Sequence, residues 1–266
     1  MNTFTGERQA GHRGVRCPIA VIVAVLAAVC PGTPLAAGQP QGKLWPWVQD
    51  FESQTPGESP KGWYASWGKH GDDLLIISNI QSAGGKQSLL FDRTGQVIEF
   101  GGWVTPFPNA PEGWLQFSFA FRVEGAGSAA QFGIEIRAAA SDAGRRVLGL
   151  AFGECTVKTI PMNEAGAGAS AREAKSEVLG TFERDVWYRI DAWLPSRSVG
   201  PAEGRVTLHR RKGPDTWEPV GKPAACKMFP PAVGYGTLML VAAPESRGYK
   251  VFFDDIRAVQ VAAPDP

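Results

Sequence analysis

The segment "VWYRIDAWLP" (186–195) alternates between two kinds of side chain. The charged and indole side chains occupy every second position: Trp187, Arg189, Asp191 and Trp193. In an extended strand such positions lie on one face of the sheet. Flat indole rings suit the C–H faces of sugar rings, and guanidinium and carboxylate groups hydrogen-bond hydroxyl groups. The pattern predicts a carbohydrate-binding face, and packing at a core margin is the alternative for each Trp.

Two further residues of this kind follow the same alternation in "QFGIEIR" (131–137). Glu135 and Arg137 oppose Phe132, Ile134 and Ile136, and we include the two charged residues among the candidate glycan contacts. If this strand lies next to 186–195, the opposite charges of the two strands form a ladder of cross-strand ion pairs instead.

Two other Trp residues stand outside these alternating runs. Trp103 in "GGWVTPFPN" and Trp217 in "PDTWEPV" are further candidates, and we expect both in loops. All nine Trp residues of the chain lie after residue 40.

The elements that position these side chains are predicted to be β-strands. After residue 40, short alternating or apolar runs are separated by Gly, Pro, Asn and Asp, and helical periodicity is nearly absent. The expected strands are 47–52, 73–79, 87–93, 96–101, 114–124, 130–140, 146–153, 186–195, 204–212, 236–243 and 249–261. The polar segment 161–180 is expected to be a loop with at most one helical turn (171–177). This pattern predicts an all-β protein, a single-domain, two-sheet antiparallel sandwich of the jelly-roll kind over 47–261, with a tail at 262–266.

The alternation in "WLQFSFAFRVE" (114–124) is the most regular in the chain. Its apolar positions are Leu115, Phe117, Phe119, Phe121 and Val123, and these must face the core. Trp114, Gln116, Ser118, Ala120 and Arg122 share the opposite face.

The first residues indicate export. Basic residues precede a short apolar run, "CPIAVIVAVLAAVC" (17–30), and small residues follow it. We expect a signal peptide over 1–37, a flexible leader over 38–46 and a secreted, periplasmic or extracellular mature protein; an uncleaved anchor is the alternative. The mature part would carry a formal charge near −1 and has no basic run, so nothing indicates nucleic-acid binding, and the mature part is not expected to be membrane-embedded.

Two cysteines remain after residue 37. Cys155 and Cys226 are free to oxidise in an exported chain, and we predict a disulfide between them. Two buried free thiols are the alternative, because pairing needs a Cα separation that sequence cannot show.

The order of several motifs resembles the jelly-roll domains of the concanavalin A-like and carbohydrate-binding-module families. The motifs are "DFES" (50–53), "PKGW" (60–63), "SAGGKQSLLF" (82–91), "GWLQFSFAFRV" (113–123), "WYRIDAWL" (187–194) and "VFFDDIRAV" (251–259). The resemblance spans about 47–261. It implies an exported β-sandwich of a kind often attached to glycan-degrading systems, and it does not imply an activity.

The resemblance also bears on "KGWYASWGKHG" (61–71). The resembling modules often bury a Trp after this turn, so we expect Trp63 in the core and Trp67, which shares its parity, at the core margin. Tyr64 then faces outward, and Tyr64 and His70 are expected to be surface contacts.

Related modules often hold a structural calcium ion where the first and last strands meet. Four acids lie on the strands expected to meet there: Asp50, Glu52, Asp254 and Asp255. Hard cations take several oxygen ligands, so these four residues are the predicted calcium site. Carboxylates that cap turns are the alternative, and an inward carboxylate requires either a cation or backbone amides.

Catalytic signatures are weak. A retaining glycosidase needs two carboxylates about 5–5.5 Å apart, and Arg137 and Ala139 stand where same-face partners of Glu135 would be. A polysaccharide lyase needs a Tyr or His base, and His209 in "RVTLHRRK" reads more readily as a surface residue. We therefore expect a non-catalytic protein that binds a polysaccharide or cell-surface glycan. The alternatives are a glycan-active enzyme, lyase before hydrolase, and a structural or adhesion domain of the cell envelope with a protein partner.

Overall fold

The structure is a computed structural model of the 266-residue chain. It describes residues 46–67, 75–95, 101–107, 112–125, 131–138, 146–160, 176–196, 198–199, 202–228, 234–242 and 248–262. All of them belong to one compact unit, Pro31–Pro266. The predicted signal peptide, most of the leader, His70, most of the helical turn predicted at 171–177 and most of the tail lie outside the described residues.

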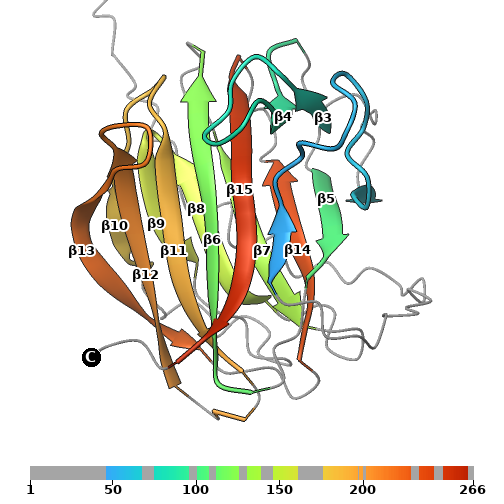
Figure 1. Ribbon diagram of the computed structural model, residues 1–266. Helices are drawn as coiled ribbons and strands as arrows, with labels where there is room; N and C mark the ends of the chain where they lie inside the picture. The colour runs from blue at the N-terminus through green and yellow to red at the C-terminus, as the bar shows by residue number, and fades with distance from the viewer. Residues whose placement is uncertain are drawn as a thin grey trace, which may run out of the picture. The chain divides into compact units, whose positions relative to one another are not determined.

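Two antiparallel sheets form a sandwich, as the sequence predicts (Figure 1). Sheet A runs in the order β13 (Trp217–Met228), β12 (Ala202–Arg211), β11 (Tyr188–Pro195), β6 (Trp114–Glu124), β15 (Lys250–Val261), β4 (Ser88–Asp92) and β3 (Leu75–Ser78), with β1 (Trp47–Gln49) paired to β15. Sheet B runs in the order β10 (Val178–Thr181), β9 (Thr156–Ile160), β8 (Arg146–Gly153), β7 (Phe132–Ala138), β14 (Tyr235–Ala242), β5 (Gly101–Pro106) and β2 (Tyr64–Trp67). Figure 1 shows sheet A in front, with β7, β8 and β9 behind it.

Aromatic side chains from both sheets fill the core. The predicted inward face of β6 is buried along its whole length, from Leu115 to Val123. Phe121 of β6 meets Phe152 of β8 across the sandwich at a centroid distance of 5.0 Å, and Phe132 stacks on Phe152 at 4.3 Å. Such aromatic contacts hold the two sheets in a fixed relation, which makes their outer faces rigid platforms.

The predicted strands agree best with the structure where the alternation is strict, and β6 and β8 have the predicted bounds. The sequence does not predict β2, β5, β9, β10 or β13. In β13, "WEPVGKPAACKM" contains two prolines that argue against a central strand, but β13 is the edge strand of sheet A, where proline is tolerated. The expectation that Trp103 and Trp217 lie in loops is wrong, because Trp103 lies on β5 with its ring in the core and Trp217 opens β13.

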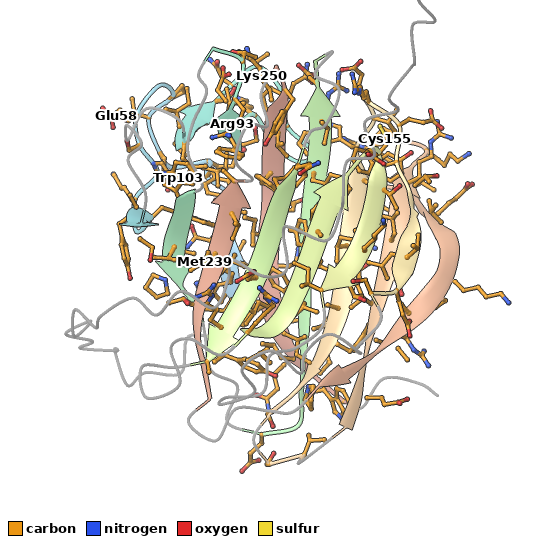
Figure 2. The ribbon with its side chains drawn as sticks, turned by 180° about the vertical axis from the view of Figure 1, so that it is seen from behind. Glu58, Arg93, Trp103, Cys155, Met239 and Lys250 are labelled. Carbon is orange, nitrogen blue, oxygen red and sulfur yellow. The ribbon has the colours of Figure 1, made fainter. Side chains whose placement is uncertain are left out.

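The predicted disulfide is also wrong, because Cys155 is a free thiol in the turn between β8 and β9 (Figure 2). Its carbonyl accepts a hydrogen bond from the Phe182 N–H, and the Phe182 ring lies 6.2 Å from that of Tyr188. The backbone of Cys226 pairs with Gly204, six residues along β12 from the residue opposite Tyr188. Six strand residues span roughly 20 Å, and a disulfide needs Cα atoms within about 7 Å.

Among the residues that the structure describes, none belongs to a helix with the length and apolar character that a membrane span requires.

Candidate binding face

The outer face of β11 carries the alternating set that the sequence singles out. The intervening residues Tyr188, Ile190 and Leu194 are buried between the sheets, so the side chains of Arg189, Asp191 and Trp193 project from the other side of sheet A. The two faces of β11 are therefore divided as the alternation predicts, and the strand lies between β6 and β12 in the interior of the sheet.

Asp191 lies at the centre of a small charged cluster on this face. Its Oδ2 is 3.0 Å from Nε of Arg189 and 3.1 Å from Nδ1 of His209, which projects from β12. Ser118 and Thr207 are its direct cross-strand neighbours, and the carboxylate is almost fully buried among these groups. Asp191 therefore holds Arg189 by a hydrogen bond and lies beside His209 Nδ1, which has no hydrogen-bond partner among the described residues, and Asp191 is not itself exposed to a ligand.

Trp217 of β13 closes one side of the cluster. The Arg189 guanidinium lies 5.1 Å from its ring centroid and the Arg211 guanidinium lies 5.9 Å away, both within cation–π range. Arg189 therefore contacts both a carboxylate and an indole, which fixes its position on the sheet surface.

Trp187 does not fit its predicted role as a sugar contact. It lies on the outer side of sheet A, but only 6% of its surface is exposed. It belongs to an apolar cluster with Leu90, Ala120 and Phe252, contributed by β4, β6 and β15. Because these neighbours cover the indole, Trp187 supports the face and has little surface to offer a ligand.

Trp193 is better placed, because it is only partly buried and has polar neighbours on both sides. Gln116 of β6 and Arg205 of β12 are its direct cross-strand partners. Trp114 lies opposite Pro195, one step further along β6, and diagonal positions of this kind are about 7–8 Å apart. We call the set Trp114, Gln116, Trp193 and Arg205 the Trp193 patch.

All four side chains of the Trp193 patch are partly exposed. Arg205 forms no hydrogen bond or ion pair with any residue in the part of the chain that the structure describes. Sequence reasoning does not single out Trp114, Gln116 or Arg205, although the alternation in β6 and β12 contains the signal. Only the register of β6, β11 and β12 brings them to Trp193.

Glu135 and Arg137 lie elsewhere, on the outer face of sheet B. The predicted ladder with Arg189 and Asp191 is therefore wrong, because β7 and β11 are in different sheets. Glu135 instead pairs within its own strand with Arg137 at 2.8 Å, and with Arg146 of β8 at 2.7 Å.

These two arginines determine the charge state of Glu135. Burial alone would raise its pKa, but the charges of Arg146 and Arg137 outweigh that effect and hold the pKa below its usual range. A 1% exposed carboxylate with a lowered pKa is unsuited to act as a general acid. Gly149 provides space for this arrangement, since a Cβ there would lie 2.4 Å from Cδ of Arg146.

Tyr64 lies apart from both groups, on β2 at the edge of sheet B. It is 41% exposed, in agreement with its predicted surface position, and Trp63 is buried as predicted. The predicted glycan contacts are therefore divided among the outer face of sheet A, the outer face of sheet B and the edge of sheet B.

The first two predicted calcium ligands hold a turn. Oε1 of Glu52 accepts hydrogen bonds from the N–H groups of Lys86 and Gln87, both at 2.8 Å. Oδ1 of Asp50 accepts a hydrogen bond from the N–H of Glu52 at 3.2 Å.

Asp254 acts on the same turn. Its Oδ2 accepts hydrogen bonds from Ala83 and Gly84 at 2.7 and 2.9 Å, and its Oδ1 accepts one from Asp255 at 2.7 Å. The residue is buried, and burial raises the pKa of its carboxyl to about 7 against the opposing effect of these amides. Asp255 pairs instead with Arg257 at 3.5 Å.

Backbone amides therefore bind three of the four carboxylates predicted to bind calcium, and Arg257 pairs with the fourth. Among the described residues, no three or more Asp, Glu, His or Cys side chains are grouped so that they could hold a metal ion. The donor set resembles turn capping more than an open oxygen cage. The calcium ion stays a prediction that these contacts do not support.

The order and pairing of the strands define a two-sheet antiparallel β-sandwich of the jelly-roll kind. The chain is similar to a PL-14 alginate lyase from Aplysia kurodai, with a TM-score of 0.52 and 13% identity over 81% of this chain and 98% of that one. It is also similar to the catalytic domain of a glycoside hydrolase family 131 protein from Coprinopsis cinerea, with a TM-score of 0.50 and 11% identity over 81% and 97% of the two chains. At such identities the likeness shows the fold alone. No family model and no curated protein matches the chain.

Proposed function

We propose that the protein is a secreted, non-catalytic binder of a polysaccharide or cell-surface glycan, and that the outer face of β6, β11 and β12 is its binding face. The observation that carries this proposal is the Trp193 patch beside the Asp191 cluster. Two partly exposed indoles lie next to an amide and an arginine without a described partner, on strands that a packed core holds rigid.

Each group on this face has a definite role in the proposal. The rings of Trp193 and Trp114 stack on successive sugar rings. Gln116 and Arg205 flank Trp193 and donate hydrogen bonds to hydroxyl or acidic groups. Asp191 holds Arg189 through Nε, and the guanidinium lies 5.1 Å from the ring centroid of Trp217.

The two solved structures support a glycan as the ligand class, at the level of fold analogy. One is named as an alginate lyase and the other as a glycoside hydrolase, so both act on glycans on a sandwich of this kind. Because unrelated functions share this fold, the analogy supports the proposal and does not replace the site argument.

One observation favours an enzyme as a second candidate. His209 Nδ1 lies 3.1 Å from the Asp191 carboxylate without a hydrogen bond between them, and Arg189 binds the same carboxylate, so an imidazole and a guanidinium lie together as the base and the cation of a lyase would. This would be β-elimination by a polysaccharide lyase. No comparable arrangement supports a hydrolase, because the only strand carboxylate proposed for it, Glu135, is ionised and paired with two arginines.

The proposal is tested by affinity gel electrophoresis of the full chain over a panel of polysaccharides. Trp193→Ala should weaken retardation by the binding polysaccharide at least about fivefold, corresponding to about 1 kcal/mol for a lost ring contact. Val178→Ala is the matched control, because Val178 is an exposed apolar residue on the edge of the other sheet.

The alternatives predict different outcomes. Formation of unsaturated uronate product, lost in His209→Ala, would identify the lyase. If no polysaccharide retards the wild type, the binding proposal fails and a structural or adhesion domain with a protein partner becomes the better account.

A further inference from the structure

We infer a second, separate binding pocket at the edge of the sandwich, which takes a single neutral sugar ring. The edge strand β2 of sheet B and the edge strand β3 of sheet A border a cavity of about 220 Å³. The residues that carry the argument are Pro60, Trp63, Tyr64, Leu75 and Trp103. Nothing in the Trp193 patch, which lies on the outer face of sheet A, contributes to this cavity.

The walls of the pocket are aromatic and well supported. Trp63 and Trp103 are turned toward the core and are buried, whereas Tyr64 is turned outward beside the cavity. Ala65 pairs with Trp103 in the β2–β5 ladder, and Trp103 on β5, labelled in Figure 2, pairs on its other side with Leu240 of β14. The volume greatly exceeds the about 10–15 Å³ that one water molecule requires.

The local backbone fixes the position of Trp63. Its N–H donates to the Pro60 carbonyl at 3.2 Å, which closes a tight turn, and Gly62 in that turn has a φ of +80° that favours glycine. The Lys61 N–H donates to Oε1 of Gln54 at 2.7 Å. The indole is therefore held in place without any bound molecule.

Trp63 supplies the polar feature that points to a ligand. Its side chain is more than nine-tenths buried, and Nε1 has no hydrogen-bond partner in the part of the chain that the structure describes. Native structures rarely leave a buried donor unsatisfied. A ligand in the adjoining cavity with an acceptor oxygen would supply the missing partner.

The lining defines the chemistry of that ligand. Apart from Ser59, the described lining residues are aromatic or aliphatic, and none is charged. Flat aromatic walls that also present polar atoms, together with a buried N–H donor, fit a neutral ring that carries an apolar face and hydrogen-bonding oxygens. The choice of a sugar for this ring rests on the proposed function. The inference that the pocket binds a ligand does not depend on that function.

The test is NMR titration of the full chain with neutral monosaccharides and their methyl glycosides, following the indole N–H resonances. The Trp63 resonance is assigned as the one missing in Trp63→Phe, which keeps an aromatic ring but removes the donor. We expect one neutral sugar to shift this resonance saturably, and Tyr64→Ala to weaken that binding at least threefold. Val178→Ala should leave it unchanged, and Tyr64→Ala keeps the test valid if Trp63→Phe does not fold.

The failure of this inference can be distinguished from failure of the proposed function. If neutral sugars leave the Trp63 resonance unmoved while polysaccharide still retards the wild type and not Trp193→Ala, the edge pocket is wrong and the binding face stands. If free indole or phenol shifts the Trp63 resonance and sugars do not, the pocket accepts aromatic compounds and the sugar assignment is overturned.

Discussion

His209 and Asp191 lie on neighbouring strands of sheet A, and Nδ1 of the imidazole is 3.1 Å from Oδ2 of the carboxylate. The same oxygen accepts a hydrogen bond from Nε of Arg189 at 3.0 Å, so one buried carboxylate lies between two groups that are more exposed than it is. This arrangement makes Asp191 the centre of the proposed binding face, although the residue itself has little contact with solvent.

Removing Asp191 should therefore loosen the face. In Asp191→Ala, Arg189 and His209 lose their shared partner, and we expect the free energy of unfolding to fall by about 1–3 kcal/mol. Urea denaturation measures this change. The matched control is Asp215→Ala in an exposed turn, which should stay within about 0.5 kcal/mol of wild type. Equal effects of the two substitutions would contradict the central role of Asp191.

Asp254 should make stability depend on pH. Burial raises its pKa to about 7 in the folded chain, from an ordinary value of 3.8 for an aspartate side chain. Between about pH 4 and pH 7 the folded state therefore retains a proton that the unfolded state has lost, so stability declines as pH rises through this window, by at most about 1.4 kcal/mol per pH unit. Denaturation at several pH values should show this slope, and Asp254→Asn should flatten it. An unchanged slope in the variant would assign the dependence to another group.

Glu135 is predicted to stabilise the fold through its ion pairs. Glu135→Gln leaves Arg146, which is buried, and Arg137 without their counter-charge, and we expect a loss of about 3–5 kcal/mol in unfolding free energy. Glu183→Gln is the control, because Glu183 forms an exposed pair with Arg210 and should cost about 1 kcal/mol or less. If Glu135→Gln were as stable as wild type, the buried ion pairs would not have this role.

Cys155 should react as a thiol without prior reduction of the protein. Its position, far from Cys226 along the sandwich, predicts that a reducing agent leaves the melting temperature unchanged. A peptide map under non-reducing conditions provides the direct measurement. Recovery of a linked peptide containing both cysteines would show that the strand register described above is wrong.

The sequence predicts the two-sheet architecture because alternation carries most of that information. In β6, five apolar residues at every second position allow no other assignment of the faces. Alternation does not identify edge strands such as β13. Their prolines are compatible with a strand only at a sheet edge, and the position of a strand in its sheet is set by its pairing with other strands.

The candidate site shows the same limit of prediction from alternation. Trp187 and Trp193 have the same parity in one strand, but Leu90 and Phe252 cover only the first of them. Those neighbours come from β4 and β15, which lie far away in the sequence. Glu135 likewise resembles a partner of Arg189 by residue type, and only the assignment of β7 to sheet B separates the two.

The most direct test of the account is the affinity of wild type and Trp193→Ala for polysaccharides, measured side by side with Val178→Ala. The account predicts that at least one polysaccharide retards the wild type and Val178→Ala equally, and that Trp193→Ala binds it at least about fivefold more weakly. Equal retardation of all three proteins by that polysaccharide would contradict the placement of the binding face on β6, β11 and β12.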